Sequence, residues 1–472
     1  MVLGGGRGPG TLAGSVRRAT AAAEPPAAGA TTPGAATGPR TLGYRARAHP
    51  YARLALDPRF SAFWIGQTLS LFGDRLHQVA LGVLVYAATD SPLATGLVFL
   101  AATVPNLLLG PVAGTFVDRW DHKKVMVTSD LLRGGLVLTI PFAVAQSVVL
   151  VYPIVFLVTT VSIFFRPAKA AVVPRIVQPD DLLAANSATW TGETLADIIG
   201  YPLAGIFVAF LGMALPIAFF ADAATYLISA VLLFAIAIPP VAREAIDRGG
   251  NAFRRFGGEL MDGWRYLRGQ PALYQNTIIS AVAQTSIGAT IALTVVYARD
   301  WLDPALIPYP GNYAAIETAI GVGNLIGGFA VGAIGSRLRK GPLIVGGMIA
   351  MGAGTVLLGL TSNVALALVG ATVVGVANLI YIIPTQTLFG EVVPMQLMGR
   401  VIAFRSSLVF GAMTGAMAFS GVLAESLGVG LVIAAFGMVT VLAGLLGAVL
   451  PAVRDPDGAV RRAAARDAPA QP

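Results

Sequence analysis

The segment GPVAGTFVDRWDHKKVMVTSDLLRG, residues 110–134, places a short charged turn between two apolar runs. Each run continues for about 20 residues beyond the turn, which is long enough to cross the hydrocarbon core of a bilayer as a helix. The charged residues from Asp118 to Lys124 would be costly inside that core and belong at its surface. The segment therefore predicts two antiparallel membrane helices joined by a turn.

Apolar runs of the same kind recur on both sides of this segment, from Phe60 onward, and Pro, Gly or charged residues separate them. Their centres lie near these residues: Asp74, Asn106, Leu136, Val158, Ile199, Tyr226, Ser286, Ile326, Gly352, Val374, Gly411 and Val439. We expect each run to form a transmembrane helix, which makes this an all-α membrane protein with twelve transmembrane helices.

The composition supports a fold that lipid surrounds. Hydrophobic residues make up 56% of the 472 residues and charged residues only 12%, about half the charged share of soluble domains. The net charge of +8 comes from loops between apolar runs, whereas a nucleic-acid binder gathers its basic residues on a soluble surface. With no cysteine and three histidines, the chain predicts no metal site and no cofactor. We expect the lipid bilayer as a partner, and no nucleic acid.

The basic residues indicate how the chain crosses the membrane. Lys and Arg gather in the tails and in alternate connections, and only the loop that holds Arg299 breaks this alternation. Because cytoplasmic loops carry the excess of Lys and Arg, we expect both termini to be cytoplasmic. The Ala/Gly/Arg-rich composition favours a bacterial plasma (inner) membrane, although the Arg-rich, acid-poor N-terminal tail also resembles an organellar transit peptide.

Composition divides the chain into five parts. We expect a disordered N-terminal tail over 1–58, a six-helix bundle over 59–238, a connector over 239–271, a second six-helix bundle over 272–452 and a C-terminal tail over 453–472. The tail lacks an apolar period and cannot bury enough surface to fold. Within the connector, apolar and charged residues alternate at helical spacing, which predicts an amphipathic helix at the membrane surface.

The two bundles repeat one another in sequence. Gly114, Asp118, Arg119, Lys123 and Lys124 follow the second apolar run. Their counterparts after the eighth run are Gly332, Ser336, Arg337, Arg339 and Lys340. Internal duplication of this kind is typical of secondary transporters, which bind their substrate between the repeats.

Four segments resemble the major facilitator superfamily, and most closely its drug:proton antiporter branch of siderophore and macrolide exporters. They are DPRFSAFWIGQTLSLFGDRLHQVAL (57–81), GPVAGTFVDRWDHKKVMVTSDLLRG (110–134), RPAKAAVVPRIVQPDDLLAANS (166–187) and GYPLAG (200–205). The resemblance covers roughly residues 57–450 and implies two pseudo-symmetric six-helix bundles. It also implies a transporter that acts as a monomer, on a small molecule, with protons as the coupling ion.

The resemblance implies roles for particular residues. It places Gly114, Asp118, Arg119, Lys123 and Lys124 in a cytoplasmic gate, in which the aspartate and the basic residues hold the gate shut; the alternative is that these charges only set topology. Gly200, Pro202 and Gly205 match part of the antiporter signature of the fifth span, but Tyr201 and Ile206 depart from it. A basic residue that such antiporters often carry early in the fourth span is also missing.

The same resemblance implies that spans one, four, seven and ten line the substrate cavity. The polar and aromatic residues of those spans are Gln78, Thr159, Phe164, Asn276, Gln284, Asn378, Tyr381 and Gln386. Neutral and aromatic side chains favour an amphipathic or lipophilic substrate. The alternative for each is an ordinary hydrogen bond between helices.

Ionisable residues inside the spans need a reason, because each costs about 2.5 to 3.5 kcal/mol on insertion scales. Asp74 and Arg75 lie in the middle of the first span, with His77 and Gln78 one turn beyond. An apolar environment favours a protonated aspartate and a neighbouring arginine favours the ionised form, so a moving partner could switch proton binding. The alternative is a static Asp74–Arg75 pair.

Glu193 and Asp197 are four residues apart in the fifth span and share a helix face. Two adjacent carboxylates cannot both ionise cheaply, so one can hold a proton, or Arg75 can pair with either. Asp222 and Glu317 are interpreted as local hydrogen-bonding or gate-edge residues. Asp130 and Arg133 are expected to neutralise each other near the cytoplasmic surface.

The leading hypothesis is proton-coupled efflux of a small amphipathic or lipophilic compound of drug, macrolide or siderophore type, by alternating access. Two alternatives remain: a lysolipid translocase or importer with the same fold, and a membrane scaffold or receptor that transports nothing. The chain lacks a phosphate-binding Gly-rich loop with its lysine, which argues against an ATP-driven pump. It also lacks a nucleophile or metal cluster, so we expect no enzymatic activity and no catalytic residues.

Overall fold

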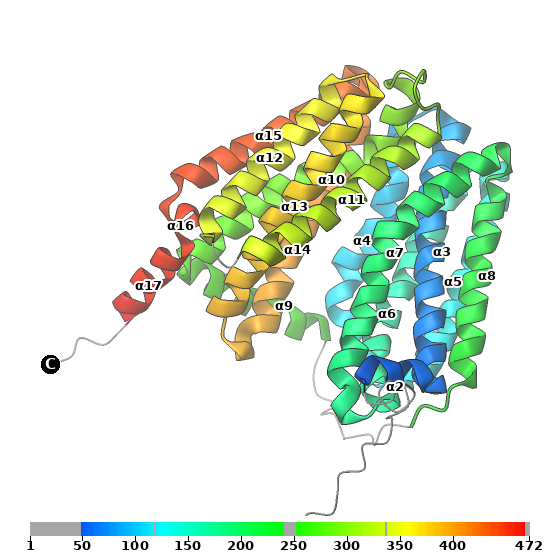
Figure 1. Cartoon of the computed structure of the whole chain (residues 1–472), viewed down its shortest axis with the longest axis horizontal. Coiled ribbons are helices and arrows are strands. Elements are labelled where there is room, and N and C mark those ends of the chain that lie inside the picture. The colour runs from blue at the N-terminus through cyan, green and yellow to red at the C-terminus, as the bar shows by residue number, and fades with distance from the viewer. Residues whose placement is uncertain (1–48, 118, 240–251, 336–337, 468–472) are drawn as a thin grey trace, which may run out of the picture. The chain divides into compact units, whose positions relative to one another are not determined.

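The computed structural model describes residues 49–117, 119–239, 252–335 and 338–467 (Figure 1). A first set of long helices comprises α3 (Pro58–Thr89), α4 (Pro92–Val117), α5 (His122–Gln146), α6 (Val151–Ile176), α7 (Leu182–Leu211) and α8 (Pro216–Ala235). A second set comprises α10 (Pro271–Asp300), α11 (Gly311–Ile334), α12 (Lys340–Leu360), α13 (Val364–Val392), α14 (Met395–Leu427) and α15 (Val429–Val449). We call these sets the N-half and the C-half.

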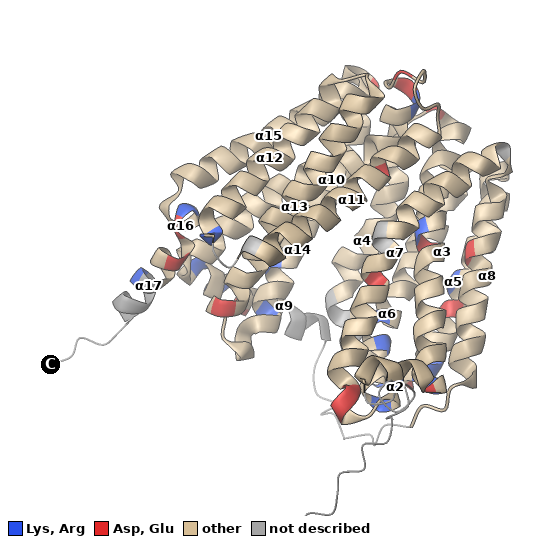
Figure 2. Ribbon diagram, in the orientation of Figure 1, with Lys and Arg blue, Asp and Glu red and all other residues tan. Residues whose placement is uncertain are grey.

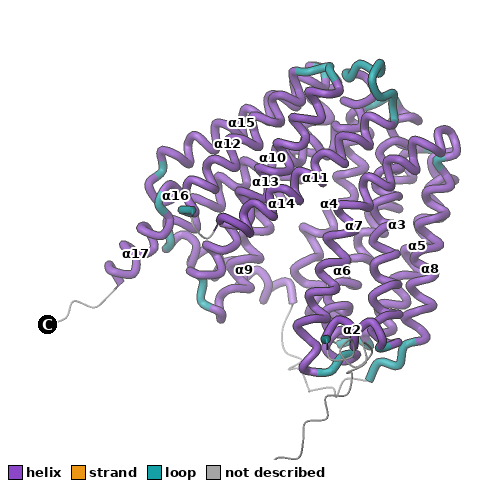
Figure 3. Tube along the Cα trace, viewed as in Figure 1, coloured by secondary structure: helices purple, strands orange, loops and turns teal. Residues whose placement is uncertain are grey.

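Helices dominate the described residues, and no strand occurs among them (Figure 3). In this part of the chain, 11 helices are long and apolar enough to span a membrane. The remaining long helix is α3, which has 32 residues and carries both Asp74 and Arg75 within its length. The predicted all-α membrane protein is confirmed, and α3 takes the place of the first predicted span.

The two halves have matching helix contacts. In the N-half, α3 packs on α7 and α8, α4 on α6, and α5 on α6 and α8. In the C-half the equivalent helices pair in the same way: α10 with α14 and α15, α11 with α13, and α12 with α13 and α15. Between the halves, α4 packs on α14 and α7 packs on α11, which are again equivalent pairs. The contacts therefore follow the internal repeat that the sequence predicts.

The predicted N-terminal tail contains a folded segment. Helix α2 (Pro50–Leu56) lies within the range 1–58, and it is held because Leu54 is buried and Arg53 pairs with Asp181. The hydrogen bond from Arg53 to this carboxylate raises the pKa of the guanidinium, so the pair stays charged. The tail prediction is therefore wrong for α2, and its first 48 residues lie outside the described residues.

Helix α9 (Ala252–Gly269) lies where the connector predicts an amphipathic helix. Its side chains contact other helices: Leu267 is buried, and the ring of Trp264 lies 5.2 Å from that of Phe404 on α14. Asp262 of α9 also accepts a hydrogen bond from Arg400 of α14 at 2.9 Å. Protein therefore covers much of the apolar face that was expected to meet lipid, and a membrane-surface role stays a prediction.

The C-terminal tail forms α16 (Pro451–Arg454) and α17 (Pro456–Asp467). Two carboxylates of this region form ion pairs with basic residues at the start of α12: Asp455 pairs with Arg339, and Asp457 pairs with Lys340. Figure 2 shows charged residues mainly at helix ends, with a smaller group partway along α3 and its neighbours. That inner group surrounds the candidate site.

Candidate functional site

A cavity of about 740 Å³ lies inside the N-half. Residues from all six long helices of this half line it, and its charged lining residues are Asp74, Arg75, Arg133, Arg166, Lys169 and Glu193. Apolar and aromatic side chains such as Phe99, Val155 and Trp190 supply the rest of the wall. Concave sites with a largely apolar wall and a few convergent polar groups are typical of small-molecule binding.

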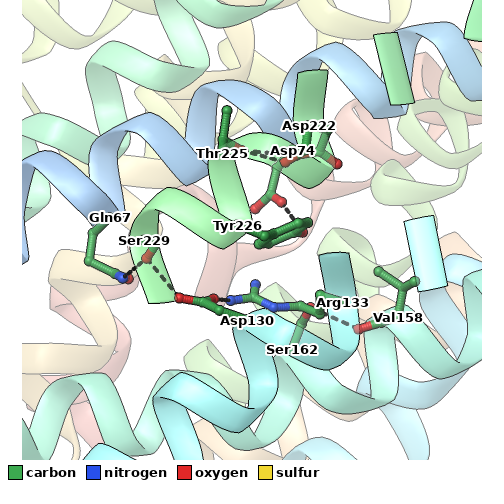
Figure 4. A network of polar contacts seen from close by, with 10 residues as sticks. All are labelled: Gln67, Asp74, Asp130, Arg133, Val158, Ser162, Asp222, Thr225, Tyr226 and Ser229. Carbon is green, nitrogen blue, oxygen red and sulfur yellow. Dashed lines mark hydrogen bonds and ion pairs between the residues drawn. The ribbon is translucent and has the colours of Figure 1, made fainter. Parts of the chain in front are cut away.

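In the wall of this cavity, a buried ion pair on α5 is connected by hydrogen bonds to α8 and, through α8, to α3 (Figure 4). Arg133 pairs with Asp130 one turn away, and both side chains are nearly inaccessible to solvent. The hydroxyl of Ser229 donates to Asp130 at 2.7 Å, and Gln67 donates to that hydroxyl at 3.1 Å. The expected neutralisation is confirmed. The pair lies in the protein interior, where Ser229 of α8 supplies the further hydrogen bond that a buried carboxylate needs.

Two aromatic rings hold the Arg133 guanidinium in place. Its Cζ atom lies 4.4 Å from the ring centroid of Phe165 on α6 and 4.4 Å from that of Tyr226 on α8. Rings at this distance stabilise a cation through their quadrupole, and more so where water is excluded. Arg133 thereby supplies a cation on the cavity wall, although no early basic residue is present in the fourth span.

Next to this pair lies a second group that involves α3 and α8. The hydroxyl of Tyr226 donates to Asp74, and Nδ1 of His77 lies 3.0 Å from Oδ2 of Asp222 (Figure 4 shows Asp74, Asp222 and Tyr226). One carboxylate oxygen each of Asp74 and Asp222 and one ring nitrogen of His77 all lie within 4.8 Å of one another. The sequence places Asp74 beside His77, and the fold adds Asp222, which we had interpreted as a local hydrogen-bonding residue.

Arg75 points toward α7 and not toward Asp74. Its guanidinium lies 5.1 Å from the ring centroid of Tyr201 and donates to Gln78 at 3.4 Å. Tyr201 donates to the same Gln78 oxygen at 3.0 Å. A Cβ atom at Gly200 would lie 3.1 Å from the Arg75 side chain, so the glycine makes room for it. Tyr201, which departs from the antiporter signature, therefore contacts Arg75 and shares a hydrogen-bond acceptor with it.

Glu193 has a partner that the sequence analysis did not assign. Lys169 of α6 donates to its carboxylate at 2.7 Å, and both side chains line the cavity. The expected competition between Glu193 and Asp197 for one proton is not tested, because the side chain of Asp197 lies outside the described residues.

The gate residues are only partly described. Asp118 lies outside the described residues, as do the surroundings of Gly114 in α4, while Arg119 is exposed. Lys123 donates to the backbone oxygens of Phe234 and Ile236, each at 2.7 Å. A cation at the last carbonyls of a helix is favourable because of the helix dipole. Lys123 therefore caps α8, and the backbone nitrogen of Lys124 donates to Asp121 at the start of α5.

Of the eight predicted cavity residues, two line the cavity: Gln78 and Thr159. Phe164 lies with its ring centroid 5.9 Å from that of Trp120, and both residues line a second hollow. In the C-half, Asn276 donates to Thr385, Asn378 donates to Asn324, and Tyr381 is buried. Gln284 and Gln386 are likewise not among the lining residues of the described cavity. Asn276 and Asn378 thus make contacts between helices of the C-half, which is the alternative that the sequence analysis left open, and a cavity role for the other three stays a prediction.

Polar contacts between the halves gather at the C-terminal ends of α3, α10 and α14. Arg299 at the end of α10 pairs with Asp90 after α3 at 2.7 Å, and its guanidinium lies 5.0 Å from the ring centroid of Tyr86. Tyr86 also donates to Asp300, and Ser91 donates to Glu425 at 2.7 Å. We call these contacts the clasp. Arg299, the one basic residue that breaks the predicted alternation of basic connections, thus makes an ion pair and a ring contact at the end of α10.

Sequence reasoning missed Asp222 and Arg133 as members of the site, although a signal was present. Asp222, Thr225, Tyr226 and Ser229 recur at helical spacing on α8 and give it one polar face. A polar face on an otherwise apolar span has to meet another polar face. On α3, Gln67, Ser70, Asp74 and His77 form that second stripe, and the two meet in the structure.

Residues 48–467 match a family described as transmembrane secretion effectors. The chain belongs to this family. Its relatives include macrolide efflux protein A of Streptococcus pyogenes, 24% identical over 376 residues that cover 79% of this chain and 90% of that protein. The MFS-type transporter YfiS of Bacillus subtilis is 28% identical over 401 residues, covering 80% of this chain and 90% of that protein.

A solved structure of the nucleoside transporter NupG has the same fold, with a TM-score of 0.68 at 12% sequence identity. The match covers 82% of this chain and 98% of that one. The resemblance to the major facilitator superfamily is thereby confirmed, and with it a membrane transporter that is not an enzyme and that acts on a small molecule.

Proposed function

We propose that this transmembrane secretion effector exports small amphipathic or lipophilic compounds in exchange for protons. The observation that carries the proposal is the cavity of the N-half, in which an apolar and aromatic wall surrounds several ionisable side chains. The apolar wall suits a lipophilic body, while Asp74 and its neighbours supply groups that can gain or lose a proton. Similarity to macrolide efflux proteins supports export as the direction.

Alternating access is the mechanism that fits the repeat. The halves can rock about the contacts between α4 and α14 and between α7 and α11. Gly205 permits the second contact, because a Cβ atom there would lie 2.7 Å from the Cα atom of Ala314. With both termini in the cytoplasm of a bacterial cell, the clasp closes the outer side and the cavity opens inward.

In this cycle the predicted coupling residues act together. A proton taken up by the group of Asp74, His77 and Asp222 would weaken its attraction for Arg75 and leave Arg75 to its contacts on α7, whereas loss of that proton would strengthen the attraction. Glu193 would release Lys169 when it accepts a proton or when a cationic substrate displaces the ammonium. We propose that a monomer suffices, since the cavity and its charged residues all belong to one chain.

Two other functions make different predictions. An importer or lysolipid translocase would move its substrate inward or between leaflets and would use the same cavity. A scaffold or receptor would have no use for ionisable residues inside the membrane, and replacing Asp74 would leave its activity unchanged. Substrate-dependent proton movement separates efflux from both.

The test measures lumenal pH in inside-out proteoliposomes that carry a proton gradient, while a macrolide, a siderophore, a lipophilic dye or a lysolipid is added. Wild-type protein is expected to release protons from the lumen when its substrate is added. Asp74→Asn is expected to lose this response, and Asp303→Asn, which alters an exposed carboxylate in the loop after α10, is expected to retain it. No response of the wild type to any compound, with these proteoliposomes holding their gradient, would contradict the proposal.

A further inference from the structure

Among the described residues, the His77–Asp222 pair joins a side chain that lines the cavity to a carboxylate that is fully buried. The Asp222 side chain is completely buried, whereas 12% of the His77 side chain is accessible. His77 lines the cavity and Asp222 lies behind it. His77 Nδ1 and Asp222 Oδ2 lie 3.0 Å apart, and apart from each other neither atom has a hydrogen-bond partner within the described part of the chain. The pair therefore connects a cavity to a carboxylate that water cannot reach directly.

Helix α3 and helix α8 build this pocket closely around Asp222. A Cβ atom at Gly73 would collide with Oδ1 of Asp222 and with the hydroxyl of Thr225. That hydroxyl also donates to Oδ1 of Asp222 at 3.3 Å. One carboxylate oxygen is thus fixed against the backbone of α3, and the other faces the imidazole of His77. The ring of Phe219 lies 6.2 Å from the imidazole and adds to the apolar surroundings.

Charged and titratable groups face the pair from each helix that packs against it. Helix α3 supplies Asp74 and Arg75, helix α5 supplies Arg133 with its partner Asp130, and helix α8 supplies Tyr226. Four of these groups are engaged with one another: Asp130 with Arg133, and Asp74 with the Tyr226 hydroxyl. In the His77–Asp222 pair, by contrast, the two facing atoms have only each other as partners among the described residues.

From this geometry we propose that the proton which drives transport is held between His77 and Asp222, and that Asp74 acts as the neighbouring fixed charge. The inference rests on the proposed proton-coupled export and names the proton site within it. Without the proton, a neutral imidazole faces a carboxylate beside a second carboxylate, and burial makes this charged state costly. With it, the pair is either an imidazolium with a carboxylate or an imidazole with a carboxylic acid, and both are neutral overall.

The proton moves in two steps, and no other bond changes. A hydronium ion in the cavity water gives its proton to the imidazole of His77 and becomes water, and the proton can then pass from the imidazole nitrogen to the facing oxygen of Asp222. Imidazole suits the first step because its unperturbed proton affinity lies in the physiological range. Release follows the same route in reverse when the cavity faces the other side of the membrane.

The experiment detects the proton without any substrate. Purified protein in lipid nanodiscs is titrated while infrared difference spectra record the carbonyl band of a protonated carboxylic acid. Wild-type protein is expected to gain one such band as the pH falls. Asp222→Asn is expected to abolish the band, and His77→Gln to shift its midpoint by about one pH unit or more, a tenfold change in proton affinity. Asp74→Asn is expected to keep the band at an altered midpoint.

A swapped variant guards against misfolding. His77→Asp combined with Asp222→His keeps one imidazole and one carboxylate in contact and is expected to restore a titrating band. A band that persists in Asp222→Asn but vanishes in Asp74→Asn would overturn the assignment and leave proton-coupled export intact. A band that behaves as expected, in a protein that moves no protons with substrate in proteoliposomes, would support the proton site and contradict the proposed export.

Discussion

The two halves share one helix arrangement but are held together by different chemistry. Within the described residues, the N-half fully buries charged side chains such as Asp130, Arg133 and Asp222, whereas the fully buried polar side chains of the C-half are neutral and its inner charges, Glu317 and Arg405, remain partly accessible. Glycines also differ between them. Gly73 of the N-half makes room for side chains, while Gly352 of the C-half faces the backbone of α15. The repeat thus preserves the packing geometry, and the interior chemistry differs between its two copies.

This difference indicates a division of labour. Buried charges rarely add stability over apolar packing of the same volume, so their presence in one half points to a role other than holding the fold. Close backbone contact between helices stabilises a membrane bundle without polar groups. Under the proposed function, the C-half would act as a rigid body and the N-half would carry the groups that change charge during transport.

The largest expected effect comes from breaking the buried ion pair of the N-half. Arg133→Met removes the cation and leaves the Asp130 carboxylate buried without its partner. Loss of one partner of a buried pair costs about 3 to 5 kcal/mol. Unfolding of purified protein in mixed micelles, followed by circular dichroism, should show this loss.

A double variant separates the charge from the packing. Asp130→Asn together with Arg133→Met removes both charges and is expected to recover most of the lost stability. If the single and double variants unfold alike, the packing of Arg133 between Phe165 and Tyr226 would carry the effect instead. The contrast between the halves would then be one of shape and not of charge.

Much of the fold could be predicted from the sequence. Runs of about 20 apolar residues determine where helices cross the membrane, because a bilayer tolerates few other structures. The duplicated turns around Lys123 and Lys340 then predicted equivalent helix pairs in both halves. Helix α2 was missed because its stability comes from the distant partner Asp181, which no local pattern shows.

The site was less predictable, because its members come from helices far apart in the sequence. Asp74, Arg75 and Glu193 could be found as charges inside apolar runs, and all three line the cavity. Their partners could not be found, since Tyr226 and Lys169 are ordinary residues until the fold brings them together. Family analogy assigned cavity residues to both halves, whereas the described cavity belongs to one.

A smaller effect is expected from the glycine contacts of the C-half. A Cβ atom at Gly352 would lie 2.6 Å from the backbone nitrogen of Val441, so Gly352→Ala must push α12 and α15 apart. Overpacking of this kind costs about 1 to 3 kcal/mol. Gly346→Ala is the matched control on the same helix, because nothing lies within 4 Å of its added methyl group. Equal stability of the two variants would contradict backbone packing as the basis of the C-half.

The smallest effect on stability, and the most direct test of how the halves move, concerns the clasp. The Arg299 and Asp90 side chains are 35% and 73% accessible, so their pair is worth only about 0.2 to 1 kcal/mol. Such a difference still changes a conformational equilibrium up to about fivefold. Arg299→Ala should therefore open the clasp side more often and leave unfolding almost unchanged.

The absence of cysteine from the sequence makes this measurable. Thr103 belongs to α4 and faces α14, because its hydroxyl lies 3.5 Å from the sulfur of Met417 on that helix. In a Thr103→Cys background, a membrane-impermeant maleimide added on the clasp side should label protein with Arg299→Ala several-fold faster than protein with an intact clasp. Arg265→Ala, which breaks an exposed pair within α9, should leave the labelling rate unchanged. If both arginine variants label at the same rate, the packing of α4 on α14 holds the two halves closed. The clasp would then add nothing measurable to the stability of the closed state.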